Sequence, residues 1–441
     1  EWPTYRRDGA RSGATSETVS RPLDRAWEAS VGEGLTALTV ADGKVFGASK
    51  DRQFVYALDA ESGETAWRFR AGAPVDSPPT VVQGRAYFGS KDGHVYCVRA
   101  TDGALVWRYR AAPDRRQIMG EQTLQSPWPV HGSVLVRDGA VFCAAGRIRF
   151  LDGGVRFLKL DAQTGELLSK TVLDRTEWGS TMHDMVDYLD MPPAMPDIPS
   201  SRGKHVFMRT QPFDLEGNPL SPDTFIGKEE FNHLFTPTGF LDDSWFHRSY
   251  WVYGTDYESG WNRWYNAGRR SPAGRIMVHS DEDVFGYGRR QRDFRWARPL
   301  DYHLFRTKKT PKKVKREGGT GGYRNPPAKK LVYDWSRELP FMVKAMALAG
   351  DELFVAGPPR IVDEKKAWEN VYSEDYKKKF RRQQRMLNGS EGSKLWAVSA
   401  SDGDKLASHQ LKALPVFDGM AVAYDGLYIA LDDGRVVCLK N

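Results

Sequence analysis

Short runs in which apolar and polar residues alternate follow one another along this chain, and Gly/Asp turns separate them. This two-residue period is typical of half-buried β-strands. Residues 41–71 and 82–111 are two copies of one pattern, in which Gly103 and Trp107 follow Gly63 and Trp67 at the same spacing. A unit of about 40 residues with four short strands is the signature of a propeller blade.

The same pattern recurs in weaker form along the rest of the chain. The further units are residues 134–168, 198–218, 239–254, 276–287, 345–357 with its continuation after an insertion, and 421–439. We predict a single all-β domain over residues 1–441, a closed propeller of eight blades. Seven blades is the alternative, if 239–265 does not form a separate blade.

The last unit has only three strands, and residues 24–30 (DRAWEAS) resemble the outer strand 65–71 of the first unit. We therefore predict that 24–30 closes the last blade, because ring closure removes exposed sheet edges. Trp67 and Trp107 should occupy equivalent packing positions in adjacent blades.

Two long insertions interrupt the repeats. Residues 306–330 contain ten Lys and Arg against one acid, Glu317, and fall in the turn between the third and fourth strands of a blade. Their Gly and Pro content predicts a mobile loop. Residues 358–393 fall between the second and third strands and predict a charged helix. Loops of this second kind share a face, here called the top face, with the crossings between blades.

Composition narrows the class of protein. The 441 residues have a formal net charge of +7, and no apolar run approaches the roughly 20 residues of a membrane helix. The 14 Trp, 18 Tyr and 21 Phe exclude wholesale disorder. The three cysteines, Cys97, Cys143 and Cys438, lie in apolar runs and are expected to be buried. The chain begins at Glu1 without an initiator methionine, and we expect a processed protein.

The segments ALDAESGETAW (57–67) and KLDAQTGELL (159–168) resemble the pyrroloquinoline-quinone-type repeat of quinoprotein dehydrogenase-like β-propellers. Residues 128–135 and 233–254 look like a subgroup found in planctomycete-type bacteria. The resemblance implies a bacterial protein of the periplasm or the exterior. It does not imply an activity, because the same repeat serves dehydrogenases and assembly scaffolds.

Quinoprotein dehydrogenases of this kind hold their cofactor with Ca²⁺, a stacking Trp and usually a disulfide between adjacent cysteines. This chain has no adjacent cysteine pair. We therefore expect no quinone cofactor.

Candidate site residues gather in the loops of the top face, around the mouth of the channel. Arg side chains bind carboxylate or sulfate in bidentate fashion and Trp faces stack on sugar rings. The predicted ligand-binding residues are Asp76, Trp128, Arg147, His233 and Asp418. His131, His183 and Asp184 are the candidates for proton transfer, because imidazole titrates near neutral pH. A divalent metal at His183 and Asp184 stays open as an alternative. For most of these residues taken singly, capping of strand ends or pairing with a nearby acid is the competing interpretation.

Two function classes remain. The first is a monomeric binding or scaffold propeller whose axial mouth takes an anionic glycan or a partner domain. The second is an enzyme, a lyase or hydrolase acting on acidic polysaccharide at the same mouth. The run DDSWFHRSYW (242–251) has residue types that a lyase needs, but strand alternation puts His247 opposite Arg248 and Tyr250, which favours blade packing. No P-loop, dinucleotide or hydrolase motif is present, and nucleic acid is not an expected partner.

Overall fold

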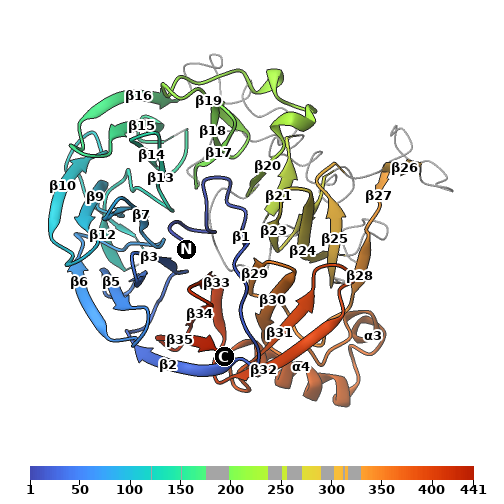
Figure 1. Ribbon diagram of the computed structural model, residues 1–441. Coiled ribbons are helices and arrows are strands. Elements are labelled where there is room, and N and C mark those ends of the chain that lie inside the picture. The colour runs from blue at the N-terminus through green and yellow to red at the C-terminus, as the bar shows by residue number, and fades with distance from the viewer. Residues whose placement is uncertain are drawn as a thin grey trace.

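A computed structural model shows eight sheets of three to five strands arranged as blades around a central axis (Figure 1). It describes residues 1–120, 122–149, 151–174, 198–236, 251–255, 271–289, 302–310, 313–315 and 329–441. The prediction of an all-β, eight-bladed propeller is confirmed.

Blades 1 and 2 are the two regular repeats, and each has four antiparallel strands that run from the axis to the rim. Blade 1 consists of β3 (Thr39–Ala41), β4 (Lys44–Ser49), β5 (Phe54–Asp59) and β6 (Thr65–Arg70). Blade 2 consists of β7 (Thr80–Val82), β8 (Arg85–Gly89), β9 (His94–Arg99) and β10 (Leu105–Arg110). The short hairpin of β11 (Ile118–Gly120) and β12 (Thr123–Gln125) follows, in the crossing to blade 3.

Blade 3 is again four-stranded, whereas the described parts of blades 4 and 5 have three strands each. Blade 3 consists of β13 (Leu135–Arg137), β14 (Ala140–Ala145), β15 (Val155–Asp161) and β16 (Leu167–Leu173). Blade 4 consists of β17 (Ser200–Arg202), β18 (His205–Met208) and β19 (Gln211–Phe213), and the 3-10 helices η3 (Pro222–Thr224) and η4 (Glu229–Phe231) follow it. Blade 5 consists of β20 (His233–Phe235), β21 (Trp251–Gly254) and β22 (Ala273–Gly274).

The two long insertions extend blades 6 and 7 at the rim (Figure 1). Blade 6 consists of β23 (Ile276–His279), β24 (Asp283–Arg289), β25 (Tyr302–Lys308) and β28 (Trp335–Arg337), and the hairpin of β26 (Lys313–Lys315) and β27 (Lys329–Leu331) lies between its third and fourth strands. Blade 7 consists of β29 (Ala345–Ala349), β30 (Glu352–Gly357), β31 (Ser393–Ser399) and β32 (Lys405–Leu411). The helices α3 (Glu364–Glu369) and α4 (Glu374–Leu387) lie between its second and third strands. Neither described helix has the length and apolar character needed to cross a bilayer.

Blade 8 joins the two ends of the chain. Its strands β33 (Pro415–Ala423), β34 (Gly426–Leu431) and β35 (Arg435–Lys440) are completed at the rim by β2 (Asp24–Ser30), which pairs antiparallel with β35. The prediction that residues 24–30 close the ring is therefore confirmed.

Adjacent blades are joined by a repeated tryptophan contact, here called the tryptophan latch. Trp67, on the outer strand of blade 1, donates a 2.9 Å hydrogen bond from Nε1 to the carbonyl oxygen of Ala100 in blade 2. Trp107 makes the same contact to Ala162 in blade 3 at 3.1 Å. Equivalent contacts join Trp27 to Ala60 at 3.1 Å and Trp335 to Ala400 at 3.0 Å. Trp67 and Trp107 thus occupy equivalent positions, as the repeat spacing predicts.

A glycine in the receiving turn makes room for each indole. Gly103 has φ +74°, and a Cβ atom built there would lie 2.7 Å from the ring of Trp67. Gly63, Gly165 and Gly403 stand in the same relation to Trp27, Trp107 and Trp335. In blade 3 the small Ser169 takes the place of the indole and lies against Gly217 of blade 4. The G-x-x-x-W spacing of the repeat therefore encodes both halves of the contact.

Residues 1–15, here called the N-terminal arm, lie at the centre of the ring (Figure 1). The arm forms backbone hydrogen bonds with the inner strands of several blades in turn. Its backbone bonds are Trp2 with Val40 at 2.7 and 2.8 Å, Pro3 with Val81 at 2.7 Å, Gly9 with Ser201 at 2.7 Å, Ser12 with His279 at 2.8 Å and Gly13 with Leu348 at 2.9 Å. Its last two residues form β1 (Ala14–Thr15), which pairs parallel with β29. The arm thereby satisfies backbone groups that an open channel would leave to water.

A buried ion pair fixes the arm to blade 8. The guanidinium of Arg6 donates to Asp418, and both side chains are almost fully buried. The hydroxyl of Tyr5 donates to the same carboxylate at 2.6 Å, and Arg6 also lies over the ring of Trp251 at 4.5 Å. Burial, together with the charge of Asp418, raises the pKa of Tyr5 well above its ordinary value, so this hydroxyl stays a donor.

Replacing the indole of one latch tests its contribution to stability. Trp67→Ala removes a buried ring and leaves the Ala100 carbonyl without its donor, so the free energy of unfolding should fall by about 3–5 kcal/mol. Arg68→Ala, an exposed change on the same strand, is the control and should change it by less than about 0.5 kcal/mol. Denaturant melts measure both. A loss below about 1 kcal/mol for Trp67→Ala would contradict the structural role.

The buried ion pair gives a second stability prediction. Arg6→Met leaves the Asp418 carboxylate buried without its cation, which should lower the free energy of unfolding by about 3–5 kcal/mol. The double variant Arg6→Met with Asp418→Asn removes the uncompensated charge and should recover part of that loss. Arg7→Met, on a half-exposed neighbour, serves as the control in the same melts. Equal losses in the single and double variants would show that the charge of Asp418 is not what makes Arg6 necessary.

Candidate functional site

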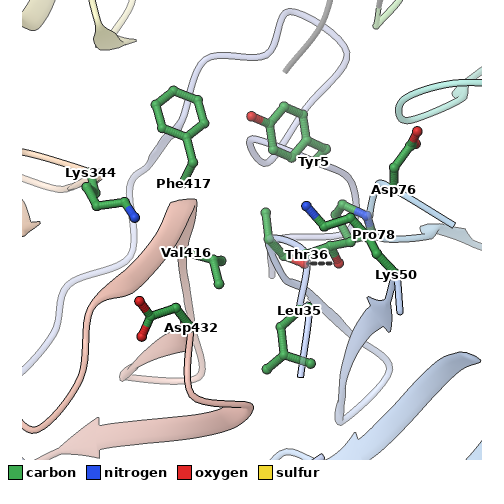
Figure 2. Close-up of a pocket in the computed structure, with 12 residues that line it drawn as sticks. Tyr5, Leu35, Thr36, Lys50, Asp76, Pro78, Lys344, Val416, Phe417 and Asp432 are labelled. Carbon is green, nitrogen blue, oxygen red and sulfur yellow. Dashed lines mark hydrogen bonds between the residues drawn. The ribbon is translucent and has the colours of Figure 1, made fainter. Parts of the chain in front are cut away.

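A pocket of about 250 Å³ lies at the mouth of the channel, between blades 7 and 8 on one side and blades 1 and 2 on the other (Figure 2). It is built from the crossings between blades and the loops between second and third strands, the top-face loops from which the sequence predicts a site. Its lining residues are Tyr5, Gly34, Leu35, Thr36, Ala37, Lys50, Asp76, Pro78, Lys344, Val416, Phe417 and Asp432.

The N-terminal arm forms the floor of this pocket. Tyr5 projects from the arm into the lining, and its hydroxyl is bonded to Asp418. Asp418 itself, a predicted ligand-binding residue, is buried and is held by Arg6 and Tyr5. The structure thus gives Asp418 a place beneath the pocket, where its charge holds the arm.

Charged side chains enter the pocket from opposite walls. The ammonium groups of Lys344 and Lys50 both point toward the central space, from the blade 7 side and the blade 1 side (Figure 2). Asp432 lies below Lys344, and the Leu414 N–H donates to its carboxylate at 3.2 Å. Burial raises the pKa of Asp432 above its ordinary value, while the charge of Lys344 acts in the opposite direction. Leu35, Val416 and Phe417 supply apolar surface between these charges.

Asp76 and His131 come together at the blade 2 wall, as their equivalent positions in the repeats suggest. The Nδ1 of His131 lies 2.9 Å from Oδ2 of Asp76, and the Gly132 N–H donates to the other carboxylate oxygen at 3.0 Å. Burial acts to raise the pKa of Asp76, but the hydrogen bond and charge of His131 and the bond from Gly132 outweigh it, and the pKa lies below its ordinary value. The carboxylate therefore accepts from Nδ1 and orients the imidazole ring.

Two other predicted ligand-binding residues, Trp128 and Arg147, lie in blade 3 outside the pocket lining. Trp128 is 3% exposed, donates from Nε1 to the Asp152 carbonyl at 2.6 Å, and has the guanidinium groups of Arg116 and Arg156 over its ring at 4.7 and 5.5 Å. Its faces are covered by these cations. Arg147 is half-buried, and its Nε and Nη2 atoms have no hydrogen-bond partner in the part of the chain that the structure describes. Neither residue lines the pocket.

His233 lies away from the mouth, within β20 of blade 5. Its ring is stacked on Phe207 with centroids 4.0 Å apart, and its two nitrogens lie 3.0 and 2.6 Å from the carbonyl oxygens of Phe231 and Arg209. Burial lowers its pKa, so the neutral ring donates to one of these oxygens at a time. This is the geometry of a packing residue. The candidates His183 and Asp184 lie outside the described residues.

Sequence reasoning missed Tyr5, Lys50, Lys344 and Asp432. In the sequence, the two lysines and Asp432 look like any polar residues of top-face loops. They come together only because the blades close into a ring. Tyr5 belongs to a segment that does not repeat. The aromatic and arginine residues of positions 2–11, which precede the closing strand, were the feature of the sequence that could have indicated a buried role for this segment.

Among the described residues, no three His, Cys, Asp or Glu side chains come together as a metal site would require. The two carboxylates of the pocket come from opposite walls, and Asp76 is already engaged by His131 and Gly132. Cys97, Cys143 and Cys438 are buried free thiols in three different blades, which agrees with the predicted burial.

The charge of Asp76 gives a pH-dependent prediction. Because folding lowers the pKa of Asp76, its contribution to stability is present above the unfolded pKa of about 3.9 and is lost as the pH falls through the folded value. Asp76→Asn should therefore lower the melting temperature at about pH 7 and converge with the parent protein below about pH 3. Asp24→Asn, exposed on β2, is the control. A difference that persists unchanged at low pH would contradict this account.

Comparison with known proteins agrees with the repeat pattern. Residues 10–211 match a family model described as "Outer membrane protein assembly factor BamB". A comparison with curated protein sequences finds no match.

Three solved structures share the fold at low sequence identity. BamB from Moraxella catarrhalis has a TM-score of 0.52 at 10% identity, covering 96% of this chain and 98% of that one. Quinohemoprotein alcohol dehydrogenase from Comamonas testosteroni has a TM-score of 0.55 at 13% identity, with 99% and 80% covered. A europium-containing methanol dehydrogenase has a TM-score of 0.54 at 11% identity, with 100% and 98% covered. These likenesses show that the chain has the β-propeller fold, and residues 10–211 carry its similarity to the family model.

Proposed function

We propose that this chain is a monomeric binding propeller whose axial pocket takes an anionic group, carried by an acidic glycan. One observation carries the proposal. Tyr5 of the N-terminal arm lines the pocket, and Lys50 and Lys344 reach into it from opposite walls.

The chemistry of the pocket favours a carboxylate or sulfate on a ring-shaped ligand. An anion placed between two ammonium groups forms charge-assisted hydrogen bonds, which are stronger than neutral ones. The ring of Phe417 and the side chains of Leu35 and Val416 offer apolar surface for the body of a sugar. A volume of about 250 Å³ suits one or two sugar units rather than a folded domain.

A partner domain is the second candidate, and the family comparison supports it. The matching family model and one of the structural neighbours are named for an assembly factor of outer-membrane proteins, and a scaffold role is compatible with this fold. The same comparison supports a place in the periplasm or outside the cell. A partner would then use the rim loops and insert an acidic side chain into the pocket.

An enzyme acting on acidic polysaccharide remains the alternative, and the paired Asp76 and His131 favour it. A carboxylate that orients an imidazole is a common arrangement for general acid–base catalysis. Such an enzyme would use His131 with His183 and Asp184 for proton transfer.

Calorimetric titration tests the proposal with trigalacturonate as the acidic probe and a neutral galactose trisaccharide as its counterpart. The parent protein should bind the acidic probe, and the neutral one at least about tenfold more weakly. Lys50→Ala with Lys344→Ala should weaken binding of the acidic probe by at least about tenfold, since a factor of ten corresponds to about 1.4 kcal/mol.

The matched control is Lys170→Ala with Lys204→Ala, which removes two exposed lysines elsewhere and should leave binding unchanged. Equal binding of both probes, or equal losses in both double variants, would reject the acidic-glycan pocket. Release of unsaturated or shortened products that His131→Ala abolishes would establish the enzyme instead.

A further inference from the structure

The second half of helix α4 concentrates positive charge. Residues 377–387 contain six Lys and Arg and no acid, in a chain whose formal net charge is +7. The described acids beside them are Glu374 and Asp375 in the first turn and Glu391 after the helix. Cations therefore outnumber acids three to one on this helix.

The helix is held firmly against blade 7, so its outer face is fixed. Gln383 and Met386 are its buried residues. The Gln383 side chain accepts from the Ile361 and Val362 N–H groups at 2.8 and 3.2 Å and donates to the Pro359 carbonyl at 2.9 Å. A helix bound through one face in this way presents its opposite face to solvent.

That opposite face has a stripe of cations. Lys378, Arg381 and Arg385 are three and four residues apart, so they lie on one side of the helix, and all three are exposed. Two other cations are paired, Lys377 with Glu374 at 2.7 Å and Arg382 with Glu391 at 2.9 Å. Within the described residues no ion pair engages Lys378 or Arg381, and the charge of Arg385 only adds to that of Arg382 in lowering the pKa of Glu391.

Exposed apolar side chains accompany the cations. Tyr372 is 89% exposed and Val371 47%, in the turn that leads into the helix, and Phe380 on the helix is 40% exposed. Isolated exposed hydrophobic residues are ordinary, but here two precede and one lies on the same helix that has the cationic stripe.

We propose that helix α4 and its leading turn dock this propeller onto a bilayer that contains anionic lipids. Because the buried face of α4 is packed on blade 7, the face free to meet a lipid headgroup layer is the one with clustered Lys and Arg, which anionic headgroups attract. Each cation can meet a separate headgroup, and the exposed Tyr and Val can enter the interface, where aromatic side chains are favoured.

The shape of the surface favours a bilayer over other anionic partners. Helix α4 projects at the rim of the ring (Figure 1), and single-stranded nucleic acids are held instead by grooves with stacking aromatic residues. Phe380 is partly covered by Tyr376, whose ring centroid lies 6.3 Å away, so it offers an edge for shallow insertion rather than a platform for base stacking.

Vesicle co-sedimentation of the whole chain tests the proposal, with phosphatidylcholine vesicles that contain or lack phosphatidylglycerol. Binding should require the anionic lipid and weaken as salt is raised. The variant Lys378→Glu, Arg381→Glu, Arg385→Glu should lower the partition coefficient by about 100-fold or more, since each basic residue near such a surface contributes about fivefold. Val371→Ser with Tyr372→Ser should lower it further at high salt, where the apolar contribution dominates.

The matched control reverses the same amount of charge elsewhere. Arg68→Glu, Arg110→Glu and Lys170→Glu are exposed positions on the outer strands of blades 1, 2 and 3, away from α4 (Figure 1). This control should keep most of the binding, and a melt of each variant shows that it is folded. Equal losses in both triple variants, binding to neutral vesicles, or binding to a DNA oligonucleotide or heparin without binding to vesicles would overturn the proposal.

Discussion

The hydrogen bond from an outer-strand tryptophan to an alanine carbonyl of the next blade is the contact on which this ring depends. It joins neighbouring sheets together with side-chain packing and with further bonds such as that from Tyr87 to the Ala162 carbonyl, and it needs a glycine with positive φ to admit the indole. Because Trp27 makes the same contact from β2, the closing blade is joined to blade 1 in the same way as blade 1 is joined to blade 2. The circular arrangement then fixes where the loops of the top face meet, and hence where a pocket can form.

A ring of this size leaves a channel lined by unpaired backbone groups, and the N-terminal arm supplies hydrogen-bond partners for some of them. Inner strands have backbone groups that face the axis, and the arm pairs with those of blades 1, 2, 4, 6 and 7. Arg11 adds a bond to the carbonyl of Pro199 at 2.9 Å, and Arg6 meets Asp418. Tyr5 of the arm and Val416, Phe417 and Asp432 of blade 8 line the pocket, so residues from both ends of the chain set its chemistry.

The structural features that follow from the repeated units of the sequence could be predicted. The Gly and Trp spacing of residues 57–67 and 97–107 encodes the latch, and the three-stranded last unit implies closure by residues 24–30. Asp76 and His131, at equivalent positions before inner strands, are brought together. The non-repeating parts could not be placed this way. The arm is buried only because eight blades surround it, and His233 points into packing because it lies within β20 rather than before it.

The position of β2 has a consequence for how the chain is made. Its partner β35 lies about 400 residues further along the chain, so β2 cannot pair until β35 has been synthesised. The ion pair between Arg6 of the arm and Asp418 likewise cannot form until Asp418 has been synthesised. During synthesis the first blades can therefore form while Trp27, Tyr5 and Arg6 are still exposed, and the nascent protein remains an open arc with two unpaired strand edges. Edges of this kind invite aggregation, so the interval before ring closure is the time at which this propeller most needs protection by a chaperone.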